Sequence, residues 1–243
     1  MSVQLPDNVV DLMALRNRIQ VFRDRSDAGR ILAGMLARYQ HSAALVLAIP
    51  AGGVPVATVI ARQLYLPLEV GVVSKVTLPW NSESGYGAVA FDGTVCLNER
   101  LLPQLGLSAE DIQQGIATTL AKVKRRVTQL RGERPLPPLT GRPVILVDDG
   151  LASGITLQTA RTALTKAGAD RLIVAVPTAH AESVQNLARE VTALYCANIR
   201  WGWSFAVADA YETWSDVSEE MVLKELQSVT MQQLSCNHPN NLE

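Results

Sequence analysis

Short apolar runs alternate with helical stretches along most of the chain. The runs are nearly continuous in apolar residues, as expected of strands that are covered on both faces. They span Ala44–Ile49, Glu69–Val76, Val144–Asp148, Leu172–Val176 and Thr192–Ala197. Between them, the spacing of apolar residues predicts crossover helices over Val54–Leu64, Thr156–Lys166 and Ala181–Glu190. This alternation predicts an α/β fold with a central, mainly parallel sheet that is flanked by helices.

Four further segments carry signals of their own. Asp92-Gly93 lies between two apolar runs in the segment Ala88–Asn98, which predicts a β-hairpin. Ser108–Arg131 predicts one long helix that opens with an imperfect capping box. Helices are also expected over Ser26–Tyr39 and near Glu219–Gln227. The 243 residues suit a single domain with its core at about 22–198, an aromatic-rich segment at 199–227 and a polar tail at 228–243.

Composition narrows the classes of partner. A formal net charge of -1 gives no electrostatic reason to expect nucleic acid or an anionic membrane as a partner. We interpret the basic run from Lys122 to Arg126 as a solvated helix face. No apolar run approaches the length of a membrane span, and the N-terminus lacks the pattern of a secretory leader. Cys96, Cys196 and Cys236 fit neither a zinc site nor a disulfide framework, so we expect a cytoplasmic protein.

The segment Val144–Thr156, VILVDDGLASGIT, carries the most chemistry. An apolar strand is followed by two acids, a loop of small residues and the start of a helix. Ligands of open α/β sheets lie outside the carboxyl ends of the strands, where this pattern places the acids. The loop offers backbone N–H groups at a helix N-terminus, an arrangement that binds phosphate. Adjacent carboxylates would repel a phosphate unless they bound ribose hydroxyls or a hydrated Mg²⁺. The alternative is a simple turn whose acids cap the helix.

This segment resembles the phosphoribosyl-pyrophosphate binding motif of type I phosphoribosyltransferases. Four more blocks resemble a bacterial group of predicted phosphoribosyltransferases. They are FRDRSDAGRILAGML (Phe22–Leu36), IPAGGVPVA (Ile49–Ala57), NSESGYGAVAFDG (Asn81–Gly93) and FAVADAYETWSDVSEEMV (Phe205–Val222). The resemblance implies a phosphoribosyltransferase-type fold, with a small hood formed by the terminal segments, and a homodimer. It also implies Mg²⁺ as cofactor and phosphoribosyl pyrophosphate with a small nitrogenous base as substrates.

The resemblance assigns a role to each matching residue. Asp148 and Asp149 would hold the ribose hydroxyls and the Mg²⁺ shell. Lys75, before the polar segment Thr77–Tyr86, would belong to a loop that closes over the site and excludes water. Phe205 or Trp203 would stack on the acceptor base, or would only fill the core of the hood. The remaining positions fall into a 5-phosphate loop and a pyrophosphate loop. They are Gly150, Leu151, Ala152, Ser153, Gly154, Ile155 and Thr156 for the first, and Ala51, Gly52 and Gly53 for the second.

Two positions depart from relatives of this kind. The bacterial group usually carries Arg where this chain has Ala51, and the loss of a cation beside the leaving pyrophosphate can remove up to roughly 3 kcal/mol of transition-state stabilisation. Ala152 stands where the 6-oxopurine enzymes carry an acidic base, so Asp148 and Asp149 are not assigned that role.

The sequence is compatible with two functions and disfavours a third. The first is transfer of a phosphoribosyl group to a nitrogenous base, with release of pyrophosphate. The second is a non-catalytic regulatory protein that binds phosphoribosyl pyrophosphate or a nucleotide, for which Ala51 is no handicap. A dinucleotide-dependent oxidoreductase is disfavoured, because no G-x-G-x-x-G follows the first predicted strand.

Overall fold

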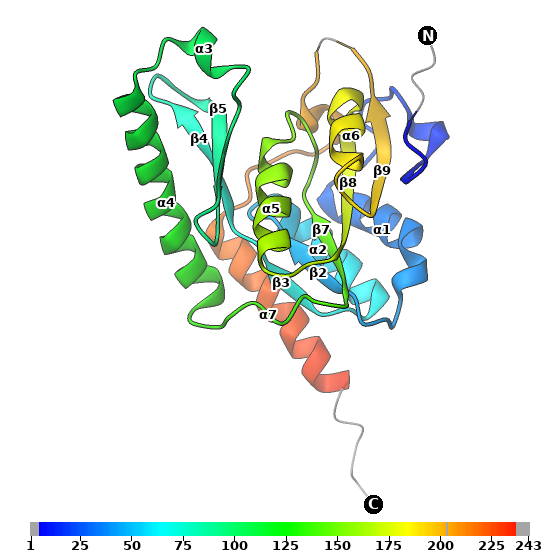
Figure 1. Ribbon diagram of the computed structural model, residues 1–243. Coiled ribbons are helices and arrows are strands. Elements are labelled where there is room, and N and C mark those ends of the chain that lie inside the picture. The colour runs from blue at the N-terminus through cyan, green and yellow to red at the C-terminus, as the bar shows by residue number, and fades with distance from the viewer. Residues whose placement is uncertain (1–4, 203, 237–243) are drawn as a thin grey trace, which may run out of the picture.

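A six-stranded parallel sheet forms the centre of the protein (Figure 1). The structure is a computed structural model that describes residues 5–202 and 204–236. From one edge to the other the strands are β1 (Val9–Asp11), β9 (Ala193–Arg200), β8 (Arg171–His180), β7 (Pro143–Val147), β2 (Leu45–Ala48) and β3 (Leu68–Val70). The α/β fold with a mainly parallel sheet is confirmed. The edge strand β1, which pairs with β9, was not predicted.

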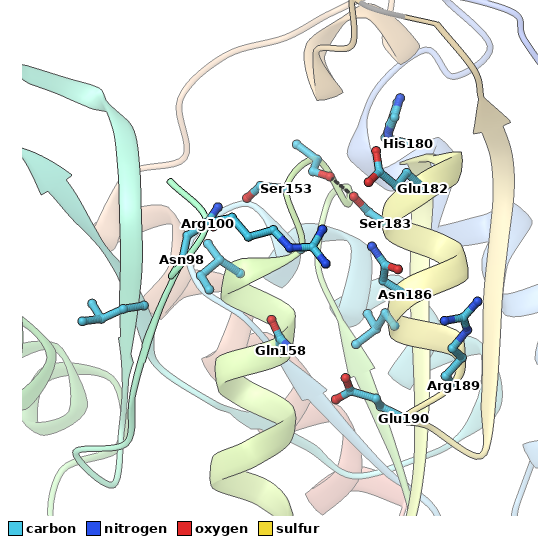
Figure 2. Close-up of a pocket in the computed structure, with 15 residues that line it drawn as sticks. Asn98, Arg100, Ser153, Gln158, His180, Glu182, Ser183, Asn186, Arg189 and Glu190 are labelled. Atoms are coloured by element: carbon cyan, nitrogen blue, oxygen red, sulfur yellow. Dashed lines mark hydrogen bonds between the residues drawn. The ribbon is translucent and has the colours of Figure 1, made fainter. Parts of the chain in front are cut away.

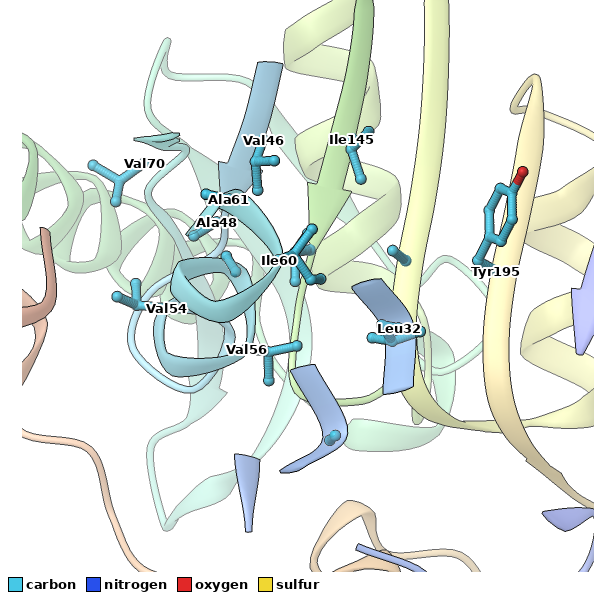
Figure 3. Close-up of a cluster of buried hydrophobic side chains, with 14 of the residues drawn as sticks. Leu32, Val46, Ala48, Val54, Val56, Ile60, Ala61, Val70, Ile145 and Tyr195 are labelled. Carbon is cyan, nitrogen blue, oxygen red and sulfur yellow. The ribbon is translucent and has the colours of Figure 1, made fainter. Parts of the chain in front are cut away.

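Helices cover both faces of this sheet. They are α1 (Arg25–Met35), α2 (Gly53–Leu64) and α7 (Glu219–Cys236) on one face, and α5 (Ile155–Lys166) and α6 (Ala181–Ala188) on the other. The strands alternate between the two hydrophobic cores: Val46 and Ile145 pack with the first group of helices, as Figure 3 shows, while Leu47 and Leu146 pack with the second. This double covering explains why the strands read as continuous apolar runs.

A three-stranded antiparallel sheet stands beside the main one. It consists of β4 (Val73–Leu78), β5 (Asn81–Ala90) and β6 (Val95–Leu97), and is followed by α3 (Leu102–Leu105) and α4 (Ala109–Arg131). The β5–β6 hairpin and its turn at Gly93, with φ of 87°, were predicted. The long helix and its capping box between Ser108 and Asp111 were predicted as well.

The single strand expected over Glu69–Val76 is wrong. The strand is interrupted at Gly71: β3 ends before it in the main sheet, and β4 begins after it in the small sheet. Gly71 is pressed against Leu47, because a Cβ there would lie 2.4 Å from that side chain. The segment Thr77–Tyr86, expected as a loop, is instead mostly strand, with β4 reaching Leu78 and β5 starting at Asn81. Apolar pattern alone does not reveal a change of sheet.

Two segments from the N-terminal and C-terminal parts of the chain pair with each other. The backbone N–H groups of Val21 and Phe22 donate to the carbonyl of Ala210, and that of Glu212 donates to the carbonyl of Phe22. These contacts form the small hood that was expected from the terminal segments. The final helix α7 continues past the predicted end at Gln227 to Cys236, so the expected polar tail begins as helix.

Candidate functional site

Two loops meet at the carboxyl ends of β2 and β7. These strands are parallel neighbours, and the backbone N–H of Ile49 donates to the carbonyl of Val147 at their carboxyl ends. The turn after β2 therefore lies beside the acids after β7, and both border one cavity of about 410 Å³. The residues that line it are Ile49, Pro50, Ala51, Gly52, Val73, Ser74, Lys75, Thr77, Lys122, Arg126, Asp148, Asp149, Gly150, Leu151, Ala152, Ser153, Gly154, Thr156, Leu157 and Val207.

Most of the residues singled out in the sequence meet in this cavity. Asp148, Asp149 and Lys75 line it, as do the loop residues from Gly150 to Gly154, Thr156, Ala51 and Gly52. Two of the proposed residues do not line it. Gly53 is the first residue of α2. A Cβ on it would lie 2.7 Å from the carbonyl oxygen of Val147, so Gly53 is in close contact with the backbone of β7. Ile155 is buried in the core and borders a neighbouring groove.

Glycine is required where the two loops touch. A Cβ on Gly52 would lie 1.9 Å from Oδ2 of Asp149, far inside any real contact. The backbone of Gly52 is helical, with φ of −61°, so the requirement is steric and comes from the carboxylate. Gly154 precedes α5 in a left-handed conformation, with φ of 82°, which brings the small-residue loop into the start of that helix. The N-termini of α2 and α5 therefore both border the cavity, where the helix dipoles favour an anion.

Burial perturbs both carboxyl groups. Desolvation, followed by the neighbouring charge of Asp149, raises the pKa of Asp148 well above its ordinary value. Desolvation also raises the pKa of Asp149, although the guanidinium of Arg25 acts in the opposite direction. The pair therefore holds protons more tightly than free carboxyls do, and an added cation would favour its ionised form.

Arg25 anchors Asp149 and was missed in the sequence. Its Nε donates to Oδ2 of Asp149 at 2.9 Å, and its Nη1 donates to the carbonyl of Ser215 at 2.8 Å. The guanidinium lies 3.8 Å from the centroid of the Trp214 ring, a cation–π contact. Tyr211 completes the anchor, because its hydroxyl donates to the backbone carbonyl of Asp149 at 2.7 Å. Only its place inside the family-like block Phe22–Leu36 could have drawn attention to Arg25.

We expected the basic run of α4 to be a solvated helix face, and this expectation is only partly correct. Lys124 and Arg125 are exposed and lie away from the cavity, but Lys122 and Arg126 line it. Arg126 is 8% exposed, and its Nε donates to Oε1 of Glu219 at 3.0 Å. The interpretation failed because α4 packs against β4 and β5, a contact that turns one side of the helix toward the site.

The described aromatic residues of the hood differ in what they contact. Tyr211 and Trp214 support Arg25 and Asp149, with their rings 5.1 Å apart. The ring centroid of Phe205 lies 5.0 Å from Cζ of Arg200 and 5.8 Å from the ring centroid of His180, and Phe205 is not among the residues that line the cavity. Trp203 lies outside the described residues. Base stacking by Phe205 or Trp203 stays a prediction.

A second, open groove of about 660 Å³ lies on the other side of the small-residue loop (Figure 2). It shares Ala152, Ser153 and Gly154 with the cavity. Figure 2 shows Arg100 extending over the start of α5, opposite Asn186 of α6. The groove lacks the paired acids and the glycine turn, so the cavity is the stronger candidate for a phosphorylated sugar.

The described residues offer the cavity two carboxylates. Among residues 5–202 and 204–236, no group of three or more His, Cys, Asp or Glu side chains is arranged to hold a metal ion. Mg²⁺ commonly binds through one or two carboxylates, with water and substrate phosphates as its other ligands. Asp148 and Asp149 fit that mode of binding.

Within the same described part of the chain, no helix combines the length and apolar character that a membrane span requires.

The chain is similar to several known proteins. The family model described as "Phosphoribosyl transferase domain" matches residues 25–210. Two Mycobacterium tuberculosis proteins, from strains H37Rv and CDC 1551, bear the name "Putative phosphoribosyl transferase" and are 35% identical over 205 residues. That match covers 84% of this chain and 46% of each relative, so the chain spans about half the length of these relatives. The crystal structure of TT1426 from Thermus thermophilus is 34% identical with a TM-score of 0.66, and the match covers 85% of this chain and 98% of that one.

Proposed function

Because the chain belongs to the phosphoribosyl transferase domain family, we propose that it transfers a phosphoribosyl group from 5-phosphoribosyl-1-pyrophosphate to a nitrogenous base. Mg²⁺ would be the cofactor, and pyrophosphate would be released. The observation that carries this proposal is the meeting of Asp148 and Asp149 with the loop residues 150–154 and 156 and the Ala51-Gly52 turn in one cavity. The acceptor base is left open.

Each part of the donor has a matching part of the cavity. The 5-phosphate would lie in the loop Gly150–Thr156, where backbone N–H groups and the N-terminus of α5 favour an anion. The ribose hydroxyls would meet Asp148 and Asp149. The pyrophosphate would lie against the turn at Ala51 and Gly52, where α2 begins. A bound Mg²⁺ would neutralise charge on the pyrophosphate and on the two carboxylates.

Catalysis would consist mainly of positioning. The bond between C1 of the ribose and the pyrophosphate oxygen breaks, and a nitrogen of the base forms the new bond to C1. The leaving pyrophosphate keeps the electron pair, and the nitrogen loses its proton to solvent. Holding donor and acceptor together lowers the barrier by removing the entropy cost of their encounter. Arg25 and Tyr211 keep Asp149 in place, while Lys75 from β4 adds positive charge beside both acids.

A second function fits one specific observation. The turn from Pro50 to Gly53 carries no charged side chain of its own, which would suit a regulatory protein that binds phosphoribosyl pyrophosphate or a nucleotide without reaction. The two functions differ in one measurable property. The transferase releases pyrophosphate in the presence of the correct base, and the binding protein does not.

Calorimetric titration of phosphoribosyl pyrophosphate, with and without Mg²⁺, tests the donor site. We expect Mg²⁺-dependent binding that is abolished in the double variant Asp148→Asn, Asp149→Asn. Glu182→Gln is a matched control, because Glu182 is an exposed acid of the neighbouring groove. Loss of binding in the control alone would move the site to that groove. Unchanged affinity in the double variant would contradict the assignment of the two acids.

A further inference from the structure

The turn that faces the pyrophosphate supplies no cation. No residue of the turn from Pro50 to Gly53 has a charged side chain, so its polar groups are those of the backbone. The two acids after β7 add negative charge to the same cavity. A pyrophosphate group bound there would need positive side chains from another element, because buried anions are stable only when they are paired.

Helix α4 brings two such cations to the cavity. Lys122 and Arg126 are four residues apart, so they project from the same side of the helix. The helix is held firmly in place, since Val123 and Leu130 are buried and Gly115 fits against Tyr86, where a Cβ would lie 2.3 Å from the hydroxyl oxygen. The two cations therefore belong to a fixed wall of the cavity.

Neither cation is fully used by contacts within the described residues. Lys122 makes no ion pair or hydrogen bond there. The Nε of Arg126 is bonded to Glu219, which leaves the two terminal nitrogens of its guanidinium without a hydrogen bond to this part of the chain. Glu219 is 41% exposed, so it offsets the charge of Arg126 only weakly. A nearly buried guanidinium with two spare nitrogens is a strong anion ligand.

A third observation comes from β4, the edge strand of the small sheet. Ser74 lines the cavity and is 6% exposed, and its buried hydroxyl has no hydrogen-bond partner among the described residues. An unpaired buried hydroxyl costs about 1–3 kcal/mol, which an oxygen-rich ligand would relieve. In the main sheet β2 lies between β7 and β3, and the chain passes from β3 directly into β4, on which α4 packs. The cations of α4 thus approach from the side of the Ala51-Gly52 turn.

We propose that Lys122 and Arg126 bind the pyrophosphate group of the donor and neutralise it as it leaves. The proposal rests on the proposed function, and it assigns to α4 the positive charge that the turn after β2 lacks. The expected ligand chemistry is a diphosphate, bound by the flexible ammonium of Lys122 and the planar guanidinium of Arg126.

The test compares two halves of the donor by calorimetry at constant Mg²⁺. Lys122→Gln and Arg126→Gln should each weaken the binding of inorganic pyrophosphate by about tenfold or more, and leave the binding of ribose 5-phosphate within about twofold of the unmodified protein. Lys124→Gln and Arg125→Gln remove the same charge from the exposed face of the helix. These controls should leave both ligands within the same twofold range, because screened exposed charges contribute little.

Glu219→Gln separates a ligand role from a structural one. It removes the ion pair of Arg126 but keeps the cation, so pyrophosphate affinity should be kept or increased. Equal losses in Arg126→Gln and Glu219→Gln for both ligands would overturn the role of Arg126. Lys122 is exposed, so Lys122→Gln remains informative even if Arg126→Gln folds poorly.

The failures of the two proposals are distinguishable. If the unmodified protein binds ribose 5-phosphate and phosphoribosyl pyrophosphate, but Lys122→Gln and Arg126→Gln bind pyrophosphate as well as the controls do, only the role of α4 is wrong. If the unmodified protein binds none of these ligands, the proposed function is wrong and this inference falls with it.

Discussion

Replacement of Gly52 by alanine tests the contact between the two loops of the site. The backbone of Gly52 is helical, with φ of −61° and ψ of −32°, a conformation that alanine adopts without strain. Alanine restricts the unfolded chain more than glycine does, an effect that by itself favours such a replacement by about 0.4–1 kcal/mol. Any loss of stability in Gly52→Ala must therefore come from the added methyl group.

The structure indicates the size of that loss. The new Cβ would lie 1.9 Å from Oδ2 and 2.5 Å from Cγ of Asp149, so the carboxylate must move. It cannot move cheaply, because Arg25 holds the same oxygen at 2.9 Å and Tyr211 holds the backbone carbonyl. Overpacking of this kind costs about 1–3 kcal/mol. After the gain from alanine is subtracted, we expect a net loss of about 1–2 kcal/mol in the free energy of unfolding and the loss of Mg²⁺-dependent donor binding.

Urea denaturation followed by circular dichroism measures the first effect, and calorimetry with phosphoribosyl pyrophosphate measures the second. Gly34→Ala is the matched control, because Gly34 lies in α1 with no atom within 4 Å of the added Cβ. That control should gain about 0.5–1 kcal/mol and bind normally. If Gly52→Ala were as stable as Gly34→Ala and bound the donor equally well, the steric argument for the contact between the loops would be refuted.

Two further predictions concern the charges of the site. The pKa of Asp148 is higher in the folded protein than in the unfolded chain, so the folded protein binds the carboxyl proton more tightly. Ionisation of Asp148 therefore destabilises the fold progressively as the pH rises above the unfolded pKa of about 3.9. Asp148→Asn should therefore be more stable than the unmodified protein at pH 8, with a smaller gain at pH 5, in urea denaturation; a gain of equal size at both pH values would contradict this account. Arg25→Met removes the partner that lowers the pKa of Asp149, so that pKa should rise further. The variant should lose about 3 kcal/mol at pH 8 and less at pH 5, because the raised pKa favours the protonated form of Asp149, which does not need the cation; an equal loss at both pH values would count against the ion pair as the cause.

Much of the candidate site could be predicted because its parts are short and local. A buried strand, two acids and a small-residue loop before a helix occupy one continuous segment, Val144–Thr156. The turn after β2 has the same character. Since the carboxyl ends of adjacent parallel strands meet at one edge, the two loops could be expected to lie together. The structure places them around one cavity, and its lining omits only Gly53 and Ile155 of the loop residues that were named.

The residues that were missed or misread act over long distances in the chain. Arg25 reaches Asp149 across 124 positions, and Arg126 reaches Glu219 across 93. No local pattern distinguishes Arg126 from its exposed neighbour Arg125, because both belong to one basic run on one helix. Only the packing of α4 against β4 and β5 decides which of the two lines the cavity.

The sequence by itself therefore determined the α/β class, most helices and strands, and the segment Val144–Thr156 with its two acids and small-residue loop, because hydrophobic periodicity and turn chemistry act within a few residues. The tertiary structure decided that the run Glu69–Val76 divides between two sheets, that Arg25 pairs with Asp149, and that α4 turns Lys122 and Arg126 toward the site. Those outcomes depend on how helices and sheets pack. Packing is a property of surfaces assembled from distant segments, so it has no signal in any single window of the chain.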